Sequence, residues 1–331
     1  GGGLGSFNHR FAQPTRHGSQ HDHHDYPPDR FPFAYQVQRD PLSGHEDGIL
    51  KRALSTNTAP KLMHTQSAAE YWTRAGSLPH TDPLGSRDAE PPPMVRFYSF
   101  GGTQHGPSGY PPSRGIGQNR ANPGDYRPYL RGLLTALDEW VVAGTEPPAS
   151  VYPRIDSGTL VSWDQRSTGF PAIPGVRYPE IIHAPLYLDR GPRWDDDRII
   201  DQQPPEIRGV YRPLTPKCDS DGNETGCLSP PEVRVPLATF TGWNLRRADV
   251  GAENELVSLV GSYIPFPRTP GERMTSSDPR RSLQERYESL DDYERQFRDV
   301  CRELVDSRYL LPEDAERLQE IWRERAAAVW R

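Results

Sequence analysis

The sequence lacks long runs of one residue class: its 331 residues contain no stretch of 18 apolar residues and no long run of Lys or Arg. Without the apolar run, no segment is predicted to span a bilayer. Without the basic run, and with a formal net charge of -6, nucleic acid is not the expected partner. The sequence leaves the compartment and the oligomeric state open.

Cysteine is also scarce, and Cys218, Cys227 and Cys301 are the only three in the chain. The first two enclose a turn-rich loop, CDSDGNETGC, whose ends can meet across a hairpin, so a disulfide is geometrically easy. Free thiols in a reducing compartment fit the same spacing equally well. Segment 219–224 (DSDGNE) has the chemistry of a tight D-G turn. It lacks calcium-loop spacing, because its glycine is fourth instead of sixth.

Hydrophobic residues make up only 34% of the chain, whereas proline (36) and glycine (29) are abundant. This composition predicts long, ordered but irregular loops. The 7 Trp, 15 Tyr and 10 Phe still provide enough apolar surface for a core. We expect three parts: a core region over 1–149, a proline-rich region of short strands over 150–270, and charged helices over 271–331.

Two helical regions stand out from this background. Segment 129–143 repeats apolar residues at helical spacing and should pack against a sheet. Its predicted apolar stripe comprises Leu130, Leu133, Leu134, Leu137, Trp140 and Val141. The charged C-terminal region is predicted to form helices over 282–310 and from Pro312 onwards, where proline suits the first helical position. Short strands are expected in GTLVSW, IIHAPLYL, EIRGVYRPL and EVRVPLATF.

Two strand-and-loop units each place a titratable residue just beyond the end of a strand. KLMHTQS is predicted to be a strand followed by the helical AAEYWTRAG, which contains Glu70. MVRFYSF is predicted to be a second strand, followed by GGTQHG with His105. Sites in open α/β sheets form at the carboxyl ends of strands, so Glu70 and His105 are a candidate acid–base pair. Asp82 and Asp88 are alternative acids.

Several stretches together resemble the C-terminal part of bacterial α/β-hydrolase domain proteins, an esterase-like family. They are GGGLGSFNHRFAQPTRH, DYPPDRFPFAY, KLMHTQSAAEYWTRAGSL, SFGGTQHGPS, LRGLLTALDEWV, FPAIPGVRYP, PLATFTGWNLR and GSYIPF. The resemblance implies an α/β fold and a serine hydrolase of carboxylic esters that needs no cofactor. Asn8, His9 and Gln104 are candidates for a pocket wall, because strand ends line the cleft in this fold. The alternative for Asn8 and His9 is that they are turn-forming polar residues.

The same resemblance implies that the nucleophile elbow and the oxyanion hole lie upstream of Gly1. In agreement, no G-x-S-x-G occurs in the sequence. The printed chain would then supply the acid and the base of the parent enzyme, and would have little activity alone. A small-molecule ester is the expected partner.

Two other classes of function remain open. A metal-dependent hydrolase could use the His21–His24 cluster (HDHH), although these residues lack the i, i+4 spacing of H-E-x-x-H. A solvated loop near the site entrance explains the cluster better. A non-catalytic binding or assembly protein that keeps the hydrolase scaffold would also lack the nucleophile elbow.

Overall fold

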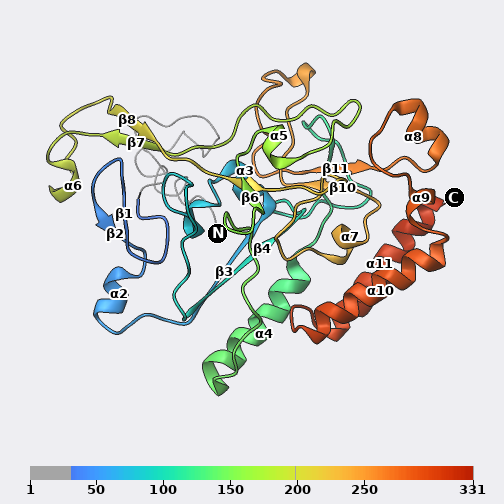
Figure 1. Cartoon of the computed structure of the whole chain (residues 1–331), viewed down its shortest axis with the longest axis horizontal. Coiled ribbons are helices and arrows are strands. Elements are labelled where there is room, and N and C mark those ends of the chain that lie inside the picture. The colour runs from blue at the N-terminus through green and yellow to red at the C-terminus, as the bar shows by residue number, and fades with distance from the viewer. Residues whose placement is uncertain (1–30, 198, 331) are drawn as a thin grey trace.

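The computed structural model describes residues 31–197 and 199–330, and Figure 1 shows how their elements are arranged. The strands are β1 (Gln38–Arg39), β2 (Glu46–Asp47), β3 (Leu62–Ser67), β4 (Val95–Phe100), β5 (Arg120–Ala121), β6 (Leu160–Val161), β7 (Leu186–Asp189), β8 (Glu206–Val210), β9 (Thr215–Pro216), β10 (Ala238–Thr241) and β11 (Ser262–Pro265). The helices are α2 (Lys51–Ser55), α3 (Ala68–Thr73), α4 (Arg127–Ala143), α5 (Gln165–Thr168), α6 (Trp194–Asp197), α7 (Pro231–Arg234), α8 (Pro270–Ser276), α9 (Leu283–Arg286), α10 (Leu290–Asp306) and α11 (Pro312–Trp330), with 3-10 turns η1 (Leu78–His80) and η2 (Ala248–Val250).

The central feature is the parallel pair β3 and β4, in register from Leu62 opposite Val95 to Ser67 opposite Phe100. Along its other edge, β4 forms parallel bridges to Val151 and Leu228. In the described residues the remaining strands form antiparallel sheets, with β10–β11–β5 the only one of three strands. The predicted strands over KLMHTQS and MVRFYSF are thus confirmed, and their carboxyl ends lie side by side.

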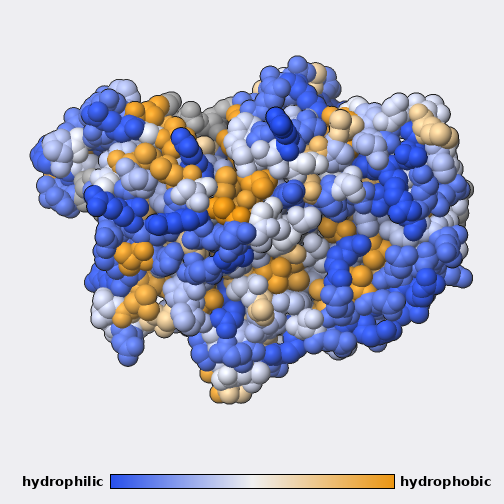
Figure 2. Space-filling view, in the orientation of Figure 1, coloured by the Kyte–Doolittle hydropathy of each residue, from blue (hydrophilic) through white to orange (hydrophobic). Residues whose placement is uncertain are grey.

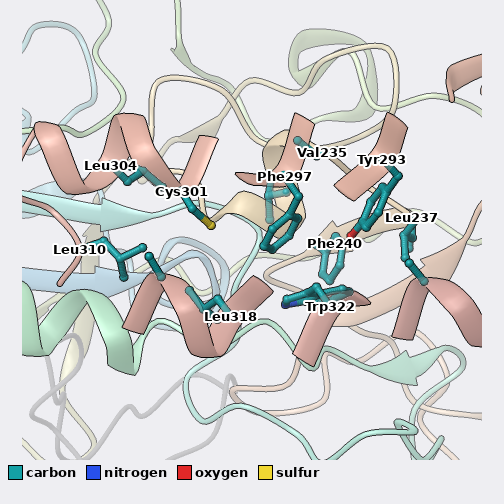
Figure 3. Packing of buried hydrophobic residues seen from close by; sticks show 14 of the residues in the cluster. Val235, Leu237, Phe240, Tyr293, Phe297, Cys301, Leu304, Leu310, Leu318 and Trp322 are labelled. Atoms are coloured by element: carbon teal, nitrogen blue, oxygen red, sulfur yellow. The ribbon is translucent and has the colours of Figure 1, made fainter. Parts of the chain in front are cut away.

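The main core joins β4 to the C-terminal helices. Tyr98 and Phe100 of β4 belong to the same buried cluster as Phe240 of β10, Phe297 of α10 and Trp322 of α11. In Figure 3, α10 and α11 lie on opposite sides of this cluster and direct their aromatic side chains toward Phe240. Figure 2 shows mostly hydrophilic residues on the outer face of these helices, at the lower right. The charged C-terminal segment therefore covers the core that supports β4.

Three local predictions need correction or refinement. Helix α4 is confirmed, but Leu134 and Val141 of the predicted stripe are exposed. The buried face instead runs through Tyr129, Gly132, Leu133, Ala136 and Trp140. A Cβ at Gly132 would lie 2.8 Å from the Tyr309 carbonyl oxygen, so glycine allows this face to approach the neighbouring backbone.

In the segment EVRVPLATF, residues 231–234 form helix α7 and only Ala238–Thr241 form a strand. Pro231 lies at the first helical position, which its fixed φ favours. The C-terminal segment forms two helices, α9 and α10, before α11 begins at Pro312 as predicted. Among the described residues, no helix is both long and apolar enough to cross a membrane.

Candidate active site: an acid–base pair at the ends of β3 and β4

Glu70 is fixed by the junction between β3 and α3. Ser67 ends β3 and is the N-cap of α3, and Glu70 is the third helical residue, so the two form a capping box. The Ser67 backbone N–H donates to Glu70 Oε2 at 2.8 Å, and the Ser67 hydroxyl donates to the same oxygen. This leaves Oε1 for another partner. The Glu70 side chain is only 4% exposed, so its carboxylate is held almost entirely away from water.

His105 is that partner. It lies in the loop after β4, and its Nδ1 is 2.5 Å from Glu70 Oε1. The imidazole is 55% exposed, so one side faces Glu70 and much of the remaining ring is open to solvent. The residues predicted to form an acid–base pair are therefore in contact, 35 positions apart in the chain.

The chemistry of the pair follows from the acceptor character of a carboxylate. Ionised Glu70 accepts a hydrogen bond, so His105 Nδ1 carries the proton and Nε2 is left as the basic atom. The hydrogen bond that His105 donates to Glu70 raises the pKa of His105 above its ordinary value, against the opposing effect of partial burial. The arrangement can thus take a proton at Nε2 and stabilise the resulting imidazolium.

The two alternative acids are engaged elsewhere. Asp82 accepts the backbone N–H groups of Ser86 and Arg87, at 2.6 and 2.8 Å, within its own turn. The Asp88 carboxylate accepts the N–H groups of Ile155 and Asp156, each at 2.9 Å. Both aspartates therefore stabilise loops, and Glu70 is the acid that contacts His105.

Gln104, predicted to line a pocket wall, supports the backbone of this loop. Its Oε1 accepts the N–H groups of Asn122 and Gly261, both at 3.0 Å, and its amide nitrogen donates to the Gly106 carbonyl at 2.5 Å. Asn8 and His9, the other predicted wall residues, lie outside the described residues, as does the His21–His24 cluster. Among the described residues, no group of three or more His, Cys, Asp or Glu could hold a metal ion.

Two contacts of the His105 loop were not predicted from the sequence. Tyr126 donates its hydroxyl to the His105 carbonyl and stacks on Phe100, with ring centroids 5.4 Å apart. Glu224 accepts the backbone N–H of Gly102 at 2.9 Å. The D-G turn around Glu224 was predicted correctly, and Gly222 has the positive φ of 80° expected there. Nothing in the local sequence indicates that this turn reaches the His105 loop.

The predicted disulfide alternative is not formed, since Cys218 and Cys227 are free thiols. Burial raises the pKa of both thiols well above the ordinary value. Neither thiol is therefore activated as a nucleophile.

Parallel strands that end in a bonded carboxylate and imidazole are the arrangement used by α/β hydrolases for the last two members of a Ser, acid, His order. The sequence supports this class directly, because the family model described as alpha/beta hydrolase domain matches residues 7–320. The chain belongs to this alpha/beta hydrolase domain family, which indicates hydrolase activity in general. No curated protein and no solved structure gives a significant match.

Proposed function

We propose that the protein is a serine hydrolase of carboxylic esters in which Glu70 orients His105 and His105 acts as base and then acid. The contact between His105 Nδ1 and Glu70 Oε1 is the observation that carries this proposal. Family membership supports the reaction class, hydrolysis. The nucleophilic serine would come from outside the printed sequence, because the sequence contains no G-x-S-x-G.

In the proposed reaction, the serine Oγ attacks the acyl carbon of the ester while His105 Nε2 removes the hydroxyl proton. The imidazolium then gives this proton to the departing alkoxide, and an acyl-enzyme and an alcohol result. Water attacks the acyl-enzyme in the same way, with its proton passing through His105, and releases the acid. Glu70 stabilises the imidazolium in both steps and needs no proton of its own.

The test is fluorophosphonate labelling of the complete gene product, with the modified peptide mapped by mass spectrometry. We expect a label on a serine outside Gly1–Arg331, formed at least about a hundred times more slowly in His105→Ala, since general-base catalysis contributes about that much. His45→Ala is the matched control, because His45 is an exposed histidine away from the site and its loss should leave the rate unchanged.

Each other outcome contradicts a specific part of the proposal. A label on a serine within the printed sequence would show that the nucleophile is misplaced. A label whose rate is unchanged in His105→Ala would remove His105 from the mechanism. No label on a folded protein would rule out the serine mechanism. Loss of esterase activity with a chelator would then favour the metal-dependent alternative, and activity of neither kind would favour a binding protein.

A further inference from the structure

The His105 loop, residues 101–106, is held by hydrogen bonds at nearly every position. The Gly102 carbonyl accepts the side-chain amide of Asn122 at 2.9 Å. The Thr103 hydroxyl donates to the Phe100 carbonyl at 2.7 Å, and the His105 N–H donates to the Leu259 carbonyl at 3.3 Å. These three acceptors are neutral carbonyl groups, and so is the side-chain carbonyl of Gln104 that braces the loop from within.

Glu224 is the exception, because it brings a carboxylate to the loop from a distant part of the chain. The Gly102 N–H donates to Glu224 Oε2 at 2.9 Å, across 122 positions of sequence. Glu224 is held in place by the turn over 219–224. In this turn the Asp219 N–H donates to the Asn223 carbonyl, and the Asp219 carboxylate accepts the Asn223 N–H. The backbone that carries the Glu224 side chain is therefore fixed by a closed turn.

The backbone of Gly102 is shaped for this contact. Its φ is +62°, which favours glycine, and a Cβ there would lie 2.7 Å from Val233 Cγ2 and 3.1 Å from Phe240 Cβ. The loop thus turns sharply against the core, and the turn directs the Gly102 N–H into a buried region. Without Glu224 this N–H would be buried and unpaired, which typically costs about 1–3 kcal/mol.

Among the described residues, no ion pair to Glu224 replaces this hydrogen bond, since the causes that shift its pKa are burial and the Gly102 N–H. Glu224 is 6% exposed, and the titratable groups that it influences are acids and thiols: Tyr71, Tyr178, Cys218 and Cys227. Burial raises the pKa of Glu224 to about 7, and the Gly102 N–H opposes this rise. Glu224 also lines a cavity of about 460 Å³, which it shares with Asp219 and with three arginines, Arg234, Arg281 and Arg286.

We propose that Glu224 is a positioning residue for the acid–base pair: by accepting the Gly102 N–H, it fixes the turn that keeps His105 Nδ1 against Glu70. The proposal rests on the proposed function for its catalytic consequence, but its structural part concerns only the His105–Glu70 contact. Among the described residues, Glu224 makes no hydrogen bond to His105 or Glu70, and it acts through the backbone of residues 102–105.

The first measurement is the pKa of His105, determined by NMR of its ring protons. In Glu224→Ala we expect the His105 pKa to fall toward its ordinary value, because the loop no longer holds Nδ1 against Glu70. Glu224→Gln retains an oxygen acceptor of the same reach and should restore the raised pKa. Asp314→Ala is the matched control: it truncates another buried carboxyl, whose ion-pair partner is Arg131 of α4, and should leave the His105 pKa unchanged.

A second measurement needs no variant that might fail to fold. In the wild-type protein, the amide resonance of Gly102 should shift with pH around neutrality as Glu224 titrates, and in Glu224→Gln it should stay constant over the same range. A folded Glu224→Ala protein in which the pKa of His105 stays raised would overturn the proposal.

Fluorophosphonate labelling of the same variants separates this inference from the proposed function. Loss of the raised His105 pKa together with labelling slowed about tenfold or more supports both, since small misplacements of catalytic groups are costly. Loss of the raised pKa in a protein that is never labelled supports the positioning role and contradicts the serine mechanism. An unchanged pKa with normal labelling contradicts the positioning role alone.

Discussion

At the scale of single residues, the two oxygens of the Glu70 carboxylate bind different partners, and this arrangement orients His105. One oxygen is held by the backbone and hydroxyl of Ser67, and the other faces the imidazole. The acid therefore cannot rotate away from His105 without breaking the cap of α3. The same three-residue spacing that starts the helix thus also orients the base.

We predict that Glu70→Gln lowers the pKa of His105 toward its ordinary value, because the hydrogen bond that His105 donates to the Glu70 carboxylate is the largest cause of the rise. The basic form of His105 exists above its pKa, so wild-type labelling should rise with pH through that raised pKa. In Glu70→Gln the rise should occur at lower pH and reach a lower plateau. Ring-proton NMR and a pH profile of labelling measure the two effects.

Asp82→Asn and Asp88→Asn are the matched controls, because each removes an acidic residue that the sequence left as an alternative. Both should leave the His105 pKa and the pH profile unchanged, although each weakens a loop. A shift of the His105 pKa in either control, with none in Glu70→Gln, would assign the acid differently.

The sequence predicted that Glu70 and His105 lie close together, because parallel strands end at one edge of a sheet. It was not sufficient to choose among three carboxylates. That choice depends on backbone N–H groups from residues 155 and 156, which occupy Asp88, and on the tight turn around Asp82. The contact between Glu224 and Gly102 could not be predicted from the sequence either, since it joins segments separated by more than a hundred residues.

At the scale of elements, close backbone contact positions α3. Gly242 follows β10, and a Cβ there would lie 2.4 Å from the Ala68 carbonyl carbon and 2.7 Å from the Ala69 nitrogen, in the first turn of α3. Backbone atoms in a helix cannot move aside as the end of a flexible side chain can. The glycine therefore sets how far α3, and with it Glu70, lies from β10.

We predict that Gly242→Ala lowers the free energy of unfolding by about 1–3 kcal/mol, as overpacking in a core does. It should also displace Glu70 from His105, so the pKa of His105 should fall. Urea denaturation and ring-proton NMR measure the two changes. Gly109→Ala is the control, because a Cβ there has no atom within 4 Å, and it should change neither quantity. A Gly242→Ala protein of normal stability would contradict the proposed role of this contact.

Helix α4 shows why an element can be predicted while its orientation is not. The apolar periodicity correctly indicated a helix. The buried face includes Gly132, however, and a glycine is not recognised as a buried position by a search for apolar side chains. The face is chosen by the close approach of the Tyr309 backbone, and that backbone belongs to a turn more than 170 residues further along the chain. Leu134 and Val141 are left exposed as a consequence.

At the scale of the whole molecule, buried titratable groups have opposite effects on how the stability of the fold changes with pH. Burial lowers the pKa of His64 and of His80 to about 3, so these neutral histidines stabilise the fold above the unfolded value of 6.5 and lose that contribution as pH falls. Glu232 acts in the opposite direction. It is 1% exposed, its Oε2 has no hydrogen-bond partner among the described residues, and burial raises its pKa to about 7.

We predict that Glu232→Gln removes a pH-dependent loss of stability. The folded state keeps the Glu232 proton up to a pKa of about 7, whereas the unfolded chain releases it near 4.5, so the wild type should lose stability as pH rises between these values. Relative to Glu232→Gln, the loss should be about 3 kcal/mol, from 1.36 kcal/mol for each unit of pKa. Urea denaturation of both proteins from about pH 4 to about pH 8 measures the difference.

Glu303→Gln is the control, because the exposed Glu303 carboxylate has its pKa lowered by Arg234 and should give a small slope of opposite sign. A difference between wild type and Glu232→Gln that stays constant over this range would show that Glu232 remains ionised in the core, and that Arg325, which attracts it, compensates for its burial.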